Sequence, residues 1–139
     1  MASRLHRSIV VPAAVVLGLT AASCGGDGGI GATEVDFSIT LDESSAAAGE
    51  LTFDVSNDAE QTHEFVIFKT DLAEDALPTD EDGNVDEEGD GVELIDEIED
   101  IEAGSTQSLT LTLDAGNYVF ICNLPGHYAQ GMHTSFTAS

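Results

Sequence analysis

The stretch Asn117–Ala138 reads NYVFICNLPGHYAQGMHTSFTA and sets two β-prone runs on either side of a loop that contains Pro and Gly. The first run is rich in aromatic and β-branched residues, and the second closes the chain, so the sequence predicts two strands joined by the loop. The loop, Cys122–His133, holds one cysteine, two histidines and one methionine. The whole chain has only 2 cysteines, 4 histidines and 2 methionines, so their concentration in one loop indicates a chemical role.

The rest of the chain shows mostly the two-residue alternation of half-buried strands. The further predicted strands are Glu34–Leu41, Leu51–Val55, Glu64–Lys69 and Ser108–Leu113. In the first of these we expect Val35, Phe37 and Ile39 to face the core, and Glu34 and Asp36 to face solvent. Short strands separated by turn-rich segments, with little helical periodicity, predict an all-β fold: an antiparallel Greek-key β-sandwich.

A long acidic insertion, Asp71–Glu102, interrupts the strand pattern. We interpret Leu72–Gly91 as a surface excursion, either ordered or partly disordered. Val92–Ile101 is compatible with a short strand or with a helix. An EF-hand beginning at Asp80 fails, because valine stands where the loop needs glycine and glycine where it needs glutamate; weak calcium binding stays open.

The first 23 residues are typical of a secretory signal: a basic start, a short apolar run and small residues. Ala21-Ala22-Ser23-Cys24 resembles the lipobox of bacterial lipoproteins, which implies lipidation of Cys24. We therefore predict a signal peptide at 1–23, a flexible tether at 24–33 and one domain at 34–139. We expect the protein to be anchored by its lipid to the outer face of the cytoplasmic membrane. If Cys24 is not lipidated, the expected location is the periplasm or the cell exterior. An ordinary secretory signal and an uncleaved anchor are the alternatives.

The composition is strongly acidic, with 27 Asp and Glu against 3 Lys and Arg and a formal net charge of −24. Beyond the predicted signal, Lys69 is the only basic residue apart from histidines. Nucleic acid is excluded as a natural partner because phosphate binding needs a basic surface. The charge favours redox partners with a basic docking surface; solubility, or adaptation to a salty medium, is the alternative.

The side chains that this loop offers, together with one histidine elsewhere, are soft ligands for a metal ion. Cys122, His127 and Met132 follow one another at intervals of five residues, and His63 stands at the start of an apolar strand. Two imidazoles, a thiolate and a weak thioether are the donors of blue copper sites, whereas magnesium and calcium prefer carboxylates. Zinc is the alternative metal, although its sites rarely use methionine.

Cysteine usage is consistent with a metal-bound thiolate. If Cys24 is lipidated, Cys122 is a free thiol in an oxidising compartment, where an unprotected thiol is oxidised. A disulfide between these two cysteines is the alternative.

Three pieces of sequence resemble the cupredoxins, the small blue copper proteins that include plastocyanin, auracyanin and sulfocyanin. They are QTHEFVIF at 61–68, AGNYVFICNLPGHYAQGM at 115–132 and SFTA at 135–138. The resemblance implies a β-sandwich that carries one copper ion near one end and shuttles between Cu(I) and Cu(II).

The resemblance also implies the ligands by position. They are His63, Cys122, His127 and Met132. In the family, the histidine matched by His127 lies close to the surface and passes the electron. Two positions depart from the pattern: Glu64 stands where many relatives have asparagine, and His133 follows the methionine. We expect His133 to be a surface residue rather than a competing ligand.

These features predict a single-electron carrier that shuttles between membrane or extracytoplasmic redox partners. We expect the carrier to be a monomer. The alternative is an extracytoplasmic copper chaperone or storage protein using the same ligands. We expect no enzymatic activity. The four ligands fill all the positions around one copper ion and leave none for a substrate, and few histidines remain for a second copper site.

Overall fold

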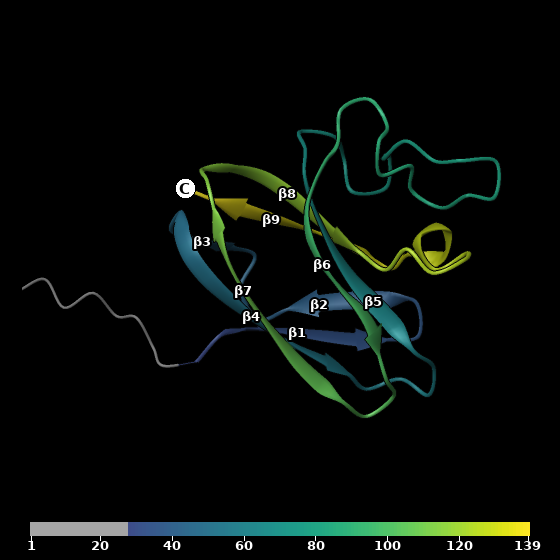
Figure 1. Ribbon diagram of the computed structural model, residues 1–139, viewed down its shortest axis with the longest axis horizontal. Helices are drawn as coiled ribbons and strands as arrows, with labels where there is room; N and C mark the ends of the chain where they lie inside the picture. Colours follow the sequence, from purple (N-terminus) through teal and green to yellow (C-terminus); the bar gives the residue numbers. More distant parts are fainter. Residues whose placement is uncertain (1–27) are drawn as a thin grey trace, which may run out of the picture.

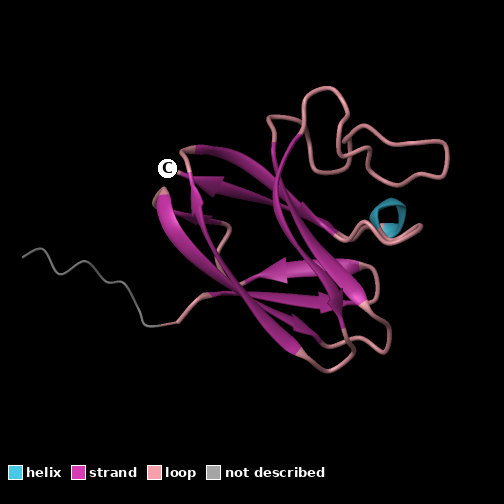
Figure 2. Cartoon of the chain, in the orientation of Figure 1, coloured by secondary structure: helices cyan, strands magenta, loops and turns pink. Residues whose placement is uncertain are grey.

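The computed structural model describes residues 28–139, which form nine strands and one short 3₁₀ helix. The strands are β1 (Ile30–Val35), β2 (Ser38–Leu41), β3 (Ser45–Ala46), β4 (Gly49–Asn57), β5 (His63–Lys69), β6 (Glu93–Ile101), β7 (Thr106–Leu113), β8 (Gly116–Ile121) and β9 (His133–Ala138), and the helix η1 covers Tyr128–Gln130. Figure 1 shows their arrangement, and Figure 2 shows how strongly strands dominate. The predicted signal and Cys24 lie outside the described residues. Within residues 28–139 no helix is long and apolar enough to span a membrane.

The strands form two sheets that enclose the core. One sheet has the order β2-β1-β4-β7 and the other β3-β9-β8-β5-β6. The β-sandwich is as predicted, but the sheets are mixed rather than strictly antiparallel, because β1 pairs in parallel with β4 and β3 with β9. Between β2 and β4 the chain crosses to the second sheet at β3, and it then returns to the first sheet as β4, beside β1.

The segment predicted as one strand, Glu34–Leu41, is instead a hairpin. The chain reverses at Asp36 and Phe37, between β1 and β2. The expected faces are also wrong at the start of the segment: Val35 is 40% exposed, whereas Glu34 is fully buried. The turn carries none of the Asn-Gly or Asp-Gly signals of two-residue hairpins, so the alternation appeared continuous. The first strand begins at Ile30, inside the segment predicted as tether.

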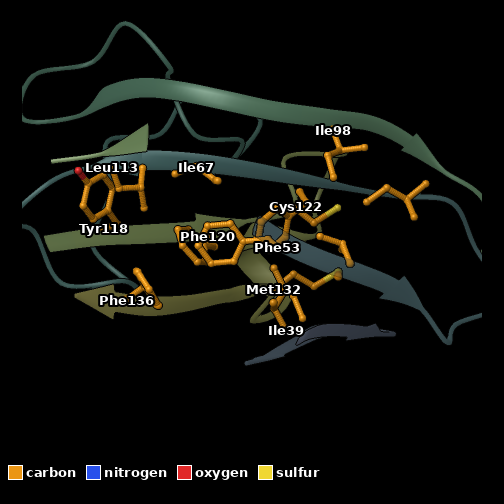
Figure 3. Packing of buried hydrophobic residues seen from close by; sticks show 14 of the residues in the cluster. Ile39, Phe53, Ile67, Ile98, Leu113, Tyr118, Phe120, Cys122, Met132 and Phe136 are labelled. Carbon is orange, nitrogen blue, oxygen red and sulfur yellow. The ribbon is translucent and has the colours of Figure 1, made fainter. Parts of the chain in front are cut away.

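Aromatic rings fill the centre of the sandwich (Figure 3). Phe53 packs edge-on against Phe120 and Phe136, with ring centroids 5.1 and 5.5 Å apart. Such pairs add about 0.5–1.5 kcal/mol each to the stabilisation from burial. Cys122 and Met132 belong to the same buried cluster, so the predicted ligands lie at the margin of a rigid apolar core.

The acidic insertion is ordered and contributes a strand. The segment Glu93–Ile101 is β6, which pairs with β5 and forms an edge of the five-stranded sheet, so the helical alternative is wrong. The preceding loop packs Leu77 and Val85 onto a second buried cluster with Tyr128. In Figure 1 this loop lies at the same end of the molecule as η1.

Candidate metal centre

Three separate elements bring the predicted ligands together. His63 is the first residue of β5, Cys122 directly follows β8, and His127 directly precedes η1. Backbone hydrogen bonds close the ligand loop, since the amide of Cys122 donates to the carbonyl of Met132 at 3.1 Å and the amide of Met132 donates to the carbonyl of His127 at 3.2 Å. Gly126, at φ 78°, provides the left-handed turn before His127.

The donor atoms of this cluster form a small triangle. His63 Nδ1 and His127 Nδ1 lie 3.2 Å apart, and Cys122 Sγ lies 3.9 and 3.3 Å from them, respectively. The centre of the circle through these three atoms is about 2.0 Å from each, close to the ~2.0–2.3 Å that nitrogen and sulfur ligands keep from a metal such as zinc. Within residues 28–139 this is the one group of three such donors. Its size and chemistry therefore fit a single transition-metal ion.

The thiol of Cys122 is fully buried, and its surroundings favour the neutral form. Burial raises its pKa to about 11, against the opposing effect of the Glu64 amide, which donates to Sγ at 3.4 Å. A thiol must lose its proton to bind a metal. The same amide is then in place to stabilise the thiolate.

His63 is also held in its neutral form. Burial, followed by the neighbouring His127, lowers the pKa of its imidazole, while Asp36 acts in the opposite direction. A neutral imidazole keeps one nitrogen lone pair for a metal. Of the two ring nitrogens, Nδ1 faces the other donors, and Nε2 lies 3.5 Å from Asp36 Oδ1.

Met132 is fully buried beside these donors. Its backbone bonds to Cys122 and His127 fix its position, and Figure 3 shows its side chain at the same end of the core as Cys122. It stays the predicted fourth ligand.

The two positions that depart from the family pattern make different contacts. His133 faces Glu74, with Nδ1 3.3 Å from Oε1, and is not part of the donor cluster. Glu64 contacts the site through its amide, and burial together with the carboxylates of Glu97 and Glu87 raises the pKa of its side chain.

Sequence reasoning missed two residues around the site. Asp36 lies against His63, and the ring of Phe37 packs edge-on against His127, with centroids 5.6 Å apart. Neither residue carries a recognisable motif, because the contact depends on where the hairpin turns. The side-chain amide of Asn57 donates to the carbonyls of Gln61 and Ile101 at 2.7 and 2.8 Å, which ties the loop before β5 to the end of β6.

Comparisons with known proteins identify the fold. No protein-family model matches the sequence, and no curated protein matches it. Among solved structures, reduced auracyanin from Roseiflexus castenholzii is 22% identical with a TM-score of 0.56, over 79% of this chain and 95% of that one. Auracyanin A, a "blue" copper protein from Chloroflexus aurantiacus, is 20% identical with a TM-score of 0.52, over 78% and 99%. Rusticyanin from Thiobacillus ferrooxidans is 16% identical with a TM-score of 0.53, over 78% and 76%.

The protein therefore has the fold of the blue copper proteins, the cupredoxin fold. Its cluster of His63, Cys122 and His127 fits a type 1 copper site.

Proposed function

We propose that this protein is a single-electron carrier with one copper ion held by His63, Cys122 and His127, and by Met132 as the weak axial ligand. The observation that carries the proposal is the convergence of one thiol and two imidazole nitrogens on a buried point, with distances that suit one metal ion. Copper supplies one-electron chemistry between Cu(I) and Cu(II), and this donor set accommodates both states.

The fold contributes rigidity to this function. His63 begins strand β5, whereas Cys122, His127 and Met132 lie in one loop between β8 and β9, and that loop is closed by its own backbone hydrogen bonds. Side chains in such a core cannot rearrange freely when the charge of the site changes. The donors therefore keep nearly the same positions in both oxidation states, which lowers the reorganisation needed for electron transfer.

His127 is the ligand best placed to exchange electrons with a partner. It is 9% exposed, whereas His63 and Cys122 are completely buried. The ring of Phe37 packs nearly perpendicular to its ring, so these two residues form the link between the site and the adjacent surface.

An electron carrier accounts for the site better than an enzyme does. The proposed ligands fill four positions around one ion and leave none for a substrate. The single alternative with some support is a copper chaperone or storage protein, since it would use the same donors. The burial of the donors favours the carrier, because a chaperone must release its metal to another protein.

The proposed setting is extracytoplasmic. The N-terminal sequence supports export and attachment to the outer face of the cytoplasmic membrane through a lipid on Cys24. We further propose that the redox partners present a basic surface, since the carrier is strongly acidic.

Copper binding to the purified protein tests the function directly. On addition of Cu(II), we expect a strong visible thiolate-to-copper absorption band and a paramagnetic signal, both of which vanish on reduction. Cys122→Ser should abolish the band, because serine provides no thiolate. The other cysteine offers a matched control, and Cys24→Ser should leave the band unchanged. A colourless protein that prefers zinc would contradict the proposal.

A second measurement separates the carrier from the chaperone. We expect the copper-loaded protein to exchange electrons with itself rapidly and to lose copper slowly to a competing chelator. Rapid loss of copper combined with slow electron exchange would favour the chaperone.

A further inference from the structure

The two ring nitrogens of His63 have very different surroundings. Nδ1 faces the donor cluster, at 3.2 Å from His127 Nδ1 and 3.9 Å from Cys122 Sγ. Nε2 is buried and makes no regular hydrogen bond within the described part of the chain. The charged group beside it is the carboxylate of Asp36, whose Oδ1 lies 3.5 Å away.

The position of Asp36 is fixed by the β1–β2 turn. The next residue, Phe37, has a φ of 65°, an unfavourable value for a bulky side chain, and its ring packs against His127. Gln61, from the loop before β5, donates from Nε2 to Asp36 Oδ1 at 3.2 Å. The turn thus contacts both histidines, and a second segment holds the carboxylate that lies against His63.

We propose that Asp36 is a positioning residue for His63: its carboxylate accepts a hydrogen bond from the Nε2–H group and thereby keeps the lone pair of Nδ1 directed at the donor cluster. Metal-binding histidines usually donate a hydrogen bond from the N–H of their second ring nitrogen to a carboxylate or carbonyl, which fixes the tautomer and the ring orientation. With the other tautomer, a hydrogen on Nδ1 would point at His127 and Cys122, and His63 could not bind a metal in this orientation.

The carboxylate also places a negative charge beside the site. This charge favours Cu(II) over Cu(I), because the oxidised site is more positive. The side chain of Asp36 is 43% exposed, so water screens part of its effect. This part of the inference rests on the proposed function, whereas the tautomer of His63 belongs to the protein without metal.

The tautomer can be measured without copper. In ¹⁵N-labelled metal-free protein, we expect two-bond proton–nitrogen spectra to show His63 protonated at Nε2 and unprotonated at Nδ1. Asp36→Asn retains an acceptor oxygen and should retain this tautomer. Asp36→Ala removes the acceptor and should give a mixture of tautomers. Asp42→Asn removes an exposed carboxylate elsewhere and should match the wild type.

Copper-loaded protein then reports the effect of the charge. Asp36→Asn should shift the preference from Cu(II) toward Cu(I) by up to about tenfold, which raises the reduction potential by up to about 59 mV. Asp36→Ala should in addition weaken Cu(II) binding by about tenfold, as loss of such partners does in other sites. Asp42→Asn should change neither the potential nor the affinity measurably.

The outcomes distinguish this inference from the proposed function. If wild-type His63 carries its proton on Nδ1, or if Asp36→Ala remains folded with its tautomer and affinity unchanged, the positioning role is wrong. If the tautomer responds as expected but the protein binds no copper, the positioning role holds and the proposed function fails.

Discussion

Glu34 is a fully buried carboxyl group on β1, and neither of its side-chain oxygens has a hydrogen-bond partner within the described structure. Its neighbours across the sheet are Ile39 and Asn57. The pKa of the Glu34 carboxyl is raised from an ordinary 4.5 to about 8, mainly because the group is buried and further because of the charge of Glu64. At neutral pH the side chain is therefore mostly uncharged, which explains how it is tolerated in the core.

This raised pKa predicts that stability falls as the pH rises. Between pH 4.5 and about pH 8 the folded protein keeps a proton that the unfolded chain releases, so the free energy of unfolding decreases across this range, by about 5 kcal/mol at the most. Glu34→Gln should flatten the decrease, because glutamine does not titrate. Urea unfolding of the metal-free protein at pH 5 and pH 8 measures the effect.

An exposed carboxylate provides the control for this experiment. Glu50, on β4, lies at the surface, and Glu50→Gln should leave the pH dependence of the wild type in place. If Glu34→Gln shows the same fall in stability as the wild type, the assignment to Glu34 is incorrect.

At the scale of elements, the acidic excursion and the ligand loop support each other. The hydroxyl of Tyr128 accepts a hydrogen bond from the amide of Leu77 at 3.0 Å and donates one to the carbonyl of Glu74 at 3.0 Å. Asn123, next to Cys122, binds Val85 through both its amide donor and its oxygen. The insertion is thus a packed cover over the ligand loop.

Tyr128→Phe should loosen this cover. The substitution keeps the ring but leaves the Leu77 amide unpaired, at a cost of about 1–3 kcal/mol. We expect faster amide hydrogen exchange in residues 72–91 and unchanged protection in β5 and β8.

A second buried tyrosine makes a matched comparison. The hydroxyl of Tyr118 donates to the carbonyl of Asp114, away from the excursion. Tyr118→Phe should lower stability without altering exchange in residues 72–91. Equal exchange in both variants would show that Tyr128 does not hold the cover.

At the scale of the whole molecule, charge is the dominant feature. The formal net charge is −24, and Lys69 is the one lysine or arginine in the described residues. An excess of this size repels anionic surfaces and attracts cationic partners over distances comparable to the Debye length, about 8 Å at physiological ionic strength.

The proposed attraction predicts that electron transfer to a cationic redox protein slows as salt is added. Stopped-flow measurement of the bimolecular rate constant between low and high ionic strength would show the decrease, because salt screens the steering. A small uncharged oxidant should show almost no salt dependence. A flat response with the cationic protein would leave solubility as the explanation of the charge.

Much of the site was predictable because its chemistry is local in the sequence. The spacing of Cys122, His127 and Met132 within one loop, together with the scarcity of these residue types elsewhere, indicated a metal site. His63 was found because its flanking sequence QTHEFVIF resembles a known pattern. The β-sandwich followed from the two-residue alternation of several strands.

The hairpin at Asp36 and Phe37 was not predictable in this way. The alternation of Glu34–Leu41 continues across the turn, so a single strand was expected and Glu34 was assigned to the wrong face. The true reversal depends on pairing between β1, β2 and β4, which is long-range information. Likewise, the residues of β6 are compatible with a strand and also with a helix, and the pairing with β5 decides for the strand.

The sequence by itself indicated one metal site with soft donors, the all-β architecture and the acidity of this protein, since these depend on residue types, short-range spacing and local motifs. Only the tertiary structure decided that a turn near the start of the domain lies against both histidines, that Glu34 is buried, and that the acidic insertion covers the ligand loop. Those contacts join residues far apart in the chain. Their geometry is set by strand pairing and core packing, which short-range sequence patterns do not specify.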